Sequence, residues 1–244
     1  MQDIYGNEFL KNLAKSSSPG SAATSDASRM EGQPASWESP AAPLETGEPG
    51  SSVGLVVRGK QSPEHKPAPT ETHADVLLSN GMPVGFFGQG TENPGPLQGL
   101  GLGMPGRVSD PTWWETYDAD LDGVGDRAAY LDGDLAESWD WRDTLCELDV
   151  TPEQAAAFDQ YWAELSADPG TFSYVGGNCS THAAEAFEAA GLISSGIPGL
   201  DTPDALYDLL LAEHGDSLRC QSGYIDFEEG EDGSWDHTVR APSP

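Results

Sequence analysis

Positive charge is scarce in this chain of 244 residues. Its 11 Lys and Arg residues stand against 41 Asp and Glu residues, which gives a formal net charge of −30. A surface this acidic repels the phosphates of nucleic acids and of anionic membranes. We therefore expect no nucleic-acid partner, and a macromolecular partner with a basic face would complement the charge.

Long hydrophobic runs are also missing. No stretch of 18 apolar residues occurs, so we expect no transmembrane segment. The first residues, "MQDIYGNEFLKNLAKSSSPG", lack the apolar run of seven or more residues that a secretory signal peptide contains. If the protein leaves its cell, we expect export by a specialised secretion apparatus.

Cysteine is rare as well. The chain has three cysteines, Cys146, Cys179 and Cys220, and none of them forms a C-x-x-C pair. At most one disulfide can therefore form, and one thiol stays free. Cys179 and His182 have half of a zinc-site spacing, but no second pair accompanies them, so we expect no zinc.

Large aliphatic residues are sparse, whereas 29 Gly and 19 Pro predict many turns. We divide the chain into three parts. Residues 1–52 are a disordered leader, in which residues 4–15 are either a short docking helix or a frayed terminus. Residues 53–230 form the folded domain, and residues 231–244 form an acidic tail.

The folded part alternates strand and helix signals. "VGLVVRG" predicts a strand from residue 53, and "THADVLLSNGMPVGFFG" predicts a hairpin that turns at Asn80-Gly81. The Gly-rich residues 88–110 predict a long loop. Helices are expected after Thr151, with Ala156, Tyr161 and Leu165 buried, and after Thr202. The fold class predicted is α+β, a small antiparallel sheet packed against helices.

The stretch "YVGGNCSTHAAEAFEAAGL", residues 174–192, carries the candidate nucleophile. If Asn178 caps a helix, Cys179 lies in its first turn, where free N–H groups and the helix dipole stabilise a thiolate. Gly177 lets the backbone turn and leaves room for a substrate. The alternative interpretation is a buried structural cysteine.

A thiol nucleophile needs a base, and two histidines are candidates. His182 follows Cys179 within the same first turns of the helix, so we place it at the rim as a binding residue. His73 begins a predicted strand. A histidine on a strand can face a cysteine at the start of a helix, so His73 is better placed than His182 to act as the base. The group that orients His73 depends on the hairpin register: a two-residue turn puts Gly88 opposite His73, and a three-residue turn puts Gln89 there. We take Gln89 as the third catalytic candidate; a backbone carbonyl is the alternative.

The order of these elements resembles a known family. A histidine on a strand, a hairpin, a helix beginning "TPEQ", the pattern around "GGNCSTHAAEAFEAAG", and then "TPDALYDLL" are similar to the circularly permuted papain-fold hydrolases. These are relatives of NlpC-type cell-wall peptidases and of lecithin:retinol acyltransferase-like proteins. The resemblance covers residues 53–211. It implies a permuted papain-like fold, with His73 as the base and Cys179 as the nucleophile. It also implies that the enzyme requires no cofactor.

A second constellation is acidic. In "YDADLDGVGDRAAYLDGD", the residues Asp118, Asp120, Asp122 and Asp126 match part of a calcium-binding loop, although Ala129 stands where a bidentate Glu is required. Asp132 or Asp134 would then complete the site in another geometry. The alternative is a solvated acidic loop.

Three functional hypotheses follow. The first is a cysteine hydrolase that cleaves amide bonds, above all in peptidoglycan stem peptides. By analogy with the family, it would be a secreted antibacterial effector that acts in the periplasm of a target cell, exported in the manner of type VI secretion, with an immunity protein and a carrier as partners. The second is a lipid acyl hydrolase or acyltransferase with the same Cys-His chemistry. The third is a non-catalytic binding module.

Overall fold

The computed structural model describes residues 51–68, 72–89, 102–116, 128–194 and 201–242. The strands are β1 (Ser52–Arg58), β2 (His73–Leu77), β3 (Pro83–Gly88), β4 (Leu102–Ser109), β5 (Asp143–Asp149), β6 (Thr171–Ser173), β7 (Arg219–Glu229) and β8 (Trp235–Arg240). The helices are α2 (Pro111–Thr116), α3 (Gly133–Ser138), α4 (Pro152–Ala167), α5 (Cys179–Ala189) and α6 (Pro203–His214), with the short 3-10 turns η2 (Ala128–Tyr130) and η3 (Gly215–Ser217). Of the predicted leader, residues 1–50 lie outside the described residues.

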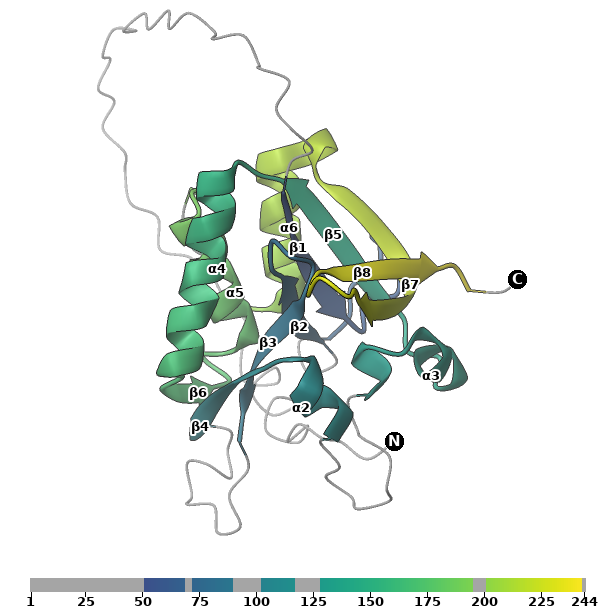
Figure 1. Ribbon diagram of the computed structural model, residues 1–244, viewed down its shortest axis with the longest axis horizontal. Helices are drawn as coiled ribbons and strands as arrows, with labels where there is room; N and C mark the ends of the chain where they lie inside the picture. Colours follow the sequence, from purple (N-terminus) through teal and green to yellow (C-terminus); the bar gives the residue numbers. More distant parts are fainter. Residues whose placement is uncertain (1–50, 69–71, 90–101, 117–127, 195–200, 243–244) are drawn as a thin grey trace, which may run out of the picture.

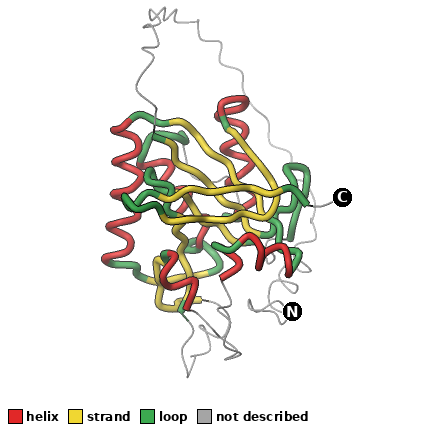
Figure 2. The backbone as a smooth tube through the Cα atoms, turned by 45° about the vertical axis from the view of Figure 1, so that its right-hand side comes forward, coloured by secondary structure: helices red, strands yellow, loops and turns green. Residues whose placement is uncertain are grey.

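The strands form one eight-stranded antiparallel sheet in the order β6-β4-β3-β2-β1-β5-β7-β8 (Figure 1). In Figure 2 the strands appear as one layer, with helices beside it. The predicted α+β class with an antiparallel sheet is confirmed. Because successive residues of a strand point to opposite faces, the two faces of this sheet have separate cores.

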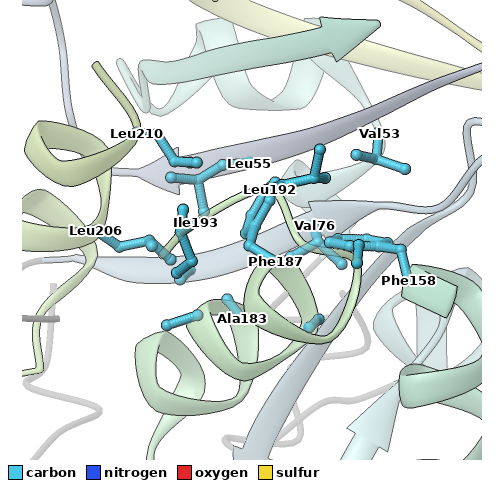
Figure 3. Close-up of a cluster of buried hydrophobic side chains, with 14 of the residues drawn as sticks. Val53, Leu55, Val76, Phe158, Ala183, Phe187, Leu192, Ile193, Leu206 and Leu210 are labelled. Carbon is cyan, nitrogen blue, oxygen red and sulfur yellow. The ribbon is translucent and has the colours of Figure 1, made fainter. Parts of the chain in front are cut away.

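Helices α4, α5 and α6 cover one face, which we call the helical face. Val53, Leu55 and Val76 point to it from β1 and β2 and are at most 1 % exposed. Phe158 of α4 packs edge-on against Phe187 of α5, with 5.0 Å between the ring centroids. Figure 3 shows these side chains together with those of α6 between helices and strands. The helical face is thus an apolar core.

The opposite face carries α2, η2, α3 and part of the β7–β8 hairpin, and its core is aromatic. Its buried members include Phe87, Trp114, Tyr130 and Phe227. Arg58, His73 and Asp75 lie among these rings and are at most 6 % exposed. We call this side of the sheet the charged face.

Helix starts follow the sequence. Thr151 caps α4 in a capping box with Gln154, and Thr202 caps α6 with Pro203 in the first turn. Of the buried stripe predicted for α4, Tyr161 and Leu165 are half-buried and pack against the core, but Ala156 is exposed. The fully buried residues of the helix are Ala155, Phe158 and Trp162. The helix of 16 residues is rotated about its axis so that its large aromatic side chains, Phe158 and Trp162, are buried.

Two other expectations are corrected. Part of the Gly-rich stretch predicted as a loop is strand β4, which pairs with both β3 and β6. Its glycines serve the pairing: Gly103 has φ +70° at a register shift, and a Cβ on Gly106 would lie 2.3 Å from the Phe86 ring. The predicted acidic tail contains β8, which pairs with β7 along its whole length.

Candidate active site

Asn178 holds the start of α5, as its place in the sequence predicts. Its side-chain oxygen accepts a hydrogen bond from the Thr181 N–H at 3.0 Å. Its Nδ2 donates to the carbonyl oxygens of Tyr174 and Asp201, both at 3.1 Å. Because all these groups are engaged within the protein, Asn178 has a structural role, and Cys179 becomes the first residue of the helix.

The thiol of Cys179 enters the sheet where two strands separate. The pairing of β2 with β3 ends at Asp75 and Gly85, one residue before Ala74. The Ala74 N–H donates instead to Cys179 Sγ, at 3.4 Å. The sulfur therefore takes a place in the backbone ladder between the two faces of the sheet, next to His73.

The His73 imidazole has fixed neighbours on the charged face. Its ring stacks on Phe87 with the centroids 4.1 Å apart. Its Nε2 lies 3.0 Å from Asp75 Oδ1, although the N–H is not aligned well enough for a hydrogen bond. With Nε2 turned to Asp75, Nδ1 is the nitrogen that remains for the Cys179 thiol.

Electrostatics favour the charged forms of this pair. Burial alone would lower the pKa of His73, but the Cys179 thiolate and the Asp75 carboxylate raise it more, to about 10. Burial alone would raise the pKa of Cys179, but the His73 imidazolium and the Ala74 N–H lower it below its usual value. Each group therefore favours the charged form of its partner, the thiolate of Cys179 and the imidazolium of His73.

Asp75 continues the polar chain away from the thiol. It is fully buried, and its pKa is lowered because His73 and Arg58 outweigh the effect of burial. Its Oδ2 accepts from Arg58 Nε at 2.6 Å, and Arg58 Nη1 donates to Asp143 Oδ2 at 2.9 Å. The strands β2, β1 and β5 thus carry a row of buried ionisable groups that ends at Asp143, where burial outweighs the effect of Arg58 and raises the pKa of the carboxyl.

Gly85 leaves the space that this row needs. A Cβ there would lie 2.1 Å from Asp75 Oδ1 and 3.0 Å from His73 Nε2. Gly177, predicted as a binding residue, is open by comparison, since the nearest atom to a Cβ would be the Thr171 carbonyl oxygen at 3.6 Å. Cys179 itself is buried, so this space lies beside the backbone that leads to the thiol.

The register predicted for the hairpin was wrong, and with it the place of Gln89. The Leu78 N–H donates to the Met82 carbonyl, so the loop covers residues 79–81 and the register puts Phe87 opposite His73. Gln89 is exposed beyond the end of β3, where its N–H donates to the Pro105 carbonyl. The polar group beside the imidazole is Asp75.

His182 belongs to a different cluster. Its Nδ1 lies 2.8 Å from the Tyr161 hydroxyl and 3.2 Å from Glu185 Oε2, and Tyr161 also donates to Glu185. Its ring packs edge-on against Phe86, with the centroids 4.2 Å apart. These contacts join α5 to α4 and β3, so His182 is held in a packing role on the helical face.

The residues of the predicted calcium loop, Asp118, Asp120, Asp122 and Asp126, lie outside the described residues. Asp132 caps α3 with its side chain, and Asp134 pairs with Arg240 at 2.7 Å. Within the described ranges, no group of three or more His, Cys, Asp or Glu side chains could hold a metal ion.

The other two cysteines form a disulfide. Cys146 of β5 and Cys220 of β7 are directly opposed in the sheet and bonded, which leaves Cys179 as the free thiol. The disulfide agrees with the expectation that at most one forms and that one thiol stays free. Cys146 and Cys220 therefore cross-link the sheet, and the candidate nucleophile Cys179 takes no part in the disulfide.

Sequence reasoning missed Asp75, Arg58 and Gly85. One signal was available: residues 73 and 75 share a face of the same strand, so His-x-Asp places a carboxylate beside the imidazole. Comparison with protein-family models, with curated proteins and with solved structures found no match for this chain. Among the described residues, no helix has the length and apolar character needed to cross a membrane.

Proposed function

We propose that this protein is a cysteine hydrolase of the permuted papain-like kind, with Cys179 as nucleophile and His73 as acid and base. The observation that carries the proposal is the thiol in the gap between β2 and β3, beside a histidine whose Nε2 lies 3.0 Å from Asp75 Oδ1. Ionisable groups with pKa values shifted by specific partners are typical of active sites. A buried structural cysteine needs no such partners.

The proposed substrate is an amide bond. The Cys179 thiolate attacks the carbonyl carbon, and the N–H groups at the start of α5 donate to the oxygen that becomes negative. His73 gives its Nδ1 proton to the leaving amine, and a thioester to Cys179 remains. His73 then takes a proton from water, which attacks the thioester and releases a carboxylic acid.

Among amide substrates we propose peptidoglycan stem peptides, and for the whole protein the role of a secreted antibacterial effector that acts in the periplasm. The disulfide between Cys146 and Cys220 supports an oxidising compartment. The net charge of −30 suits a basic immunity protein, because complementary charge speeds association. Export would use a dedicated apparatus such as type VI secretion, with a carrier protein.

The test compares wild type with Cys179→Ala, each expressed in the periplasm and in the cytoplasm of a bacterium. We expect lysis only with periplasmic wild type. Purified protein should release new amino groups from isolated sacculi, and Cys179→Ala should release none while it unfolds at the same temperature. Equal toxicity of both proteins would contradict cysteine catalysis. Cleavage of phospholipid vesicles without cleavage of sacculi would contradict the amide substrate and favour the alternative, a lipid acyl hydrolase.

A further inference from the structure

Arg58 lies behind the candidate catalytic residues, directly opposite His73 in the β1–β2 ladder. Its side chain is 1 % exposed. It donates from Nε to Asp75 Oδ2 at 2.6 Å, from Nη1 to Asp143 Oδ2 at 2.9 Å and from Nη2 to the Tyr130 carbonyl at 3.0 Å. One buried cation thus joins three neighbouring strands.

The two oxygens of Asp75 have different neighbours. Oδ2 accepts from Arg58, and Oδ1 lies 3.0 Å from His73 Nε2. A carboxylate that is held through one oxygen has its plane fixed, so the bond to Arg58 determines where Oδ1 is directed. Without it, Asp75 would be a buried carboxylate free to turn away from the imidazole.

Arg58 is itself held in place. Asp143, which pairs with it, also accepts at Oδ1 from the Gly59 N–H at 2.7 Å. The guanidinium lies over the Tyr130 ring, 4.4 Å from its centroid. A planar group with several donors in fixed directions makes these contacts at once, whereas a lysine ammonium offers a single point charge.

We propose that Arg58 is a positioning residue for the cysteine chemistry: it keeps Asp75 ionised and directed at His73, and Asp143 anchors it. This inference rests on the proposed function. Electrostatics support it, because burial raises the pKa of Asp75 while His73 and Arg58 together lower it below its usual value. Arg58 acts through Asp75 and makes no contact with a reacting atom.

Two simpler roles predict different results. If Arg58 only stabilises the fold, its loss lowers the unfolding temperature and leaves the ionisation of His73 unchanged. If Arg58 acts directly as a positive charge near His73, its loss raises the pKa of His73, because like charges disfavour protonation. If Arg58 acts through Asp75, its loss lowers the pKa of His73. The direction of the shift therefore separates the three roles.

The experiment measures the rate at which iodoacetamide alkylates Cys179, from pH 4 to pH 11, on the full chain with its disulfide intact. Wild type should show a lower inflexion from Cys179 and an upper one from His73, near its pKa of about 10. Asp75→Asn should lower the upper inflexion by about 1 to 3 pH units. Arg58→Gln should lower it by about one unit, and by almost nothing when Asp75→Asn is already present.

Arg58→Lys is the second variant, in case Arg58→Gln does not fold, and it should shift the upper inflexion in the same direction by less. Arg219→Gln is the matched control, since Arg219 pairs with Asp149 at 2.8 Å on the surface. An upper inflexion that stays in place or rises in the Arg58 variants overturns the inference. A wild-type profile with one inflexion near an ordinary thiol pKa overturns the proposed function itself.

Discussion

The helical face of the sheet buries apolar side chains, whereas the charged face buries a row of ionisable ones. On the helical face, residues such as Leu55, Phe158 and Leu206 are fully buried and need no specific partner. On the charged face, Arg58, Asp75 and Asp143 are as deeply buried and each depends on the next. The burial of charge is costly unless the groups are paired.

This difference separates stability from chemistry. Apolar burial stabilises a fold in proportion to the area removed from water. A buried charged row adds little to stability, but it fixes the ionisation and direction of the groups at its end. Cys179 lies where the two faces meet, because its helix packs on the helical face and its sulfur accepts a hydrogen bond from the backbone of β2. The four predictions that follow test this division.

The largest effect is expected at the base. His73→Gln should lower the rate of amide hydrolysis by about 10² to 10⁴ and remove the reactivity of Cys179 at acid pH, because no imidazolium stabilises the thiolate. Hydrolysis of sacculi and alkylation at pH 6 measure the two effects. His237→Gln is the control: His237 lies 3.6 Å from Glu147, away from the charged row. An equal loss in His182→Gln would assign the base role to His182.

Phe158→Ala removes a fully buried ring from the helical face. It should lower the free energy of unfolding by about 3 to 5 kcal/mol, measured by urea denaturation. The pH profile of Cys179 alkylation in the folded protein should not change. Gln160→Ala, on the exposed side of the same helix, should stay within about 0.5 kcal/mol of wild type. A shifted profile in Phe158→Ala would show that the two faces are coupled.

Gly85→Ala places a methyl group 2.1 Å from Asp75 Oδ1 and 3.0 Å from His73 Nε2. The two side chains must move apart, so hydrolysis should fall about 10-fold to 100-fold and the upper inflexion of alkylation should move to lower pH. Gly54→Ala is the comparison, because a Cβ at Gly54 would meet the Cys146 carbonyl at 3.0 Å, toward the opposite end of β1 from Arg58. It should reduce stability and leave the inflexion in place.

The smallest effect concerns stability and pH. The pKa of His73 is raised from 6.5 to about 10, so its contribution is complete below pH 6.5 and is lost as pH rises through about 10. The pKa of Cys179 is lowered from 9.0, so its contribution is complete above pH 9 and is lost as pH falls through the lowered pKa. Below pH 9 the two slopes cancel wherever the pH is above both 6.5 and the lowered pKa of Cys179.

The wild-type unfolding temperature should therefore exceed that of Cys179→Ala/His73→Gln most just below pH 9, where both groups are charged in the folded protein. The expected difference is a few degrees, which corresponds to about 1 kcal/mol. The excess should decline between pH 9 and 10 and again in acid. Calorimetry across this range measures it. An excess that is constant from pH 6 to 11 would mean that the two residues are not an ion pair in the folded protein.

Local signals predicted the helix starts and failed on the hairpin register. Asn178 and Thr151 cap their helices because a cap depends only on residues three positions away. The hairpin loop began one residue earlier than the Asn80-Gly81 signal allowed. Asp159 of α4 accepts hydrogen bonds from the N–H and the hydroxyl of Ser79, at 3.0 Å and 2.5 Å, and so holds Ser79 outside the ladder. A contact across 80 residues is invisible in the turn sequence.

The sequence by itself determined a thiol in the first turn of a capped helix, because helix capping and the helix dipole are local. Only the tertiary structure decided which groups surround that thiol. The bond from Ala74 to the sulfur, the place of Arg58 beside Asp75, and the pairing of Cys146 with Cys220 each join residues at least 17 positions apart. Such contacts depend on strand order and register, which are set by the packing of the whole sheet.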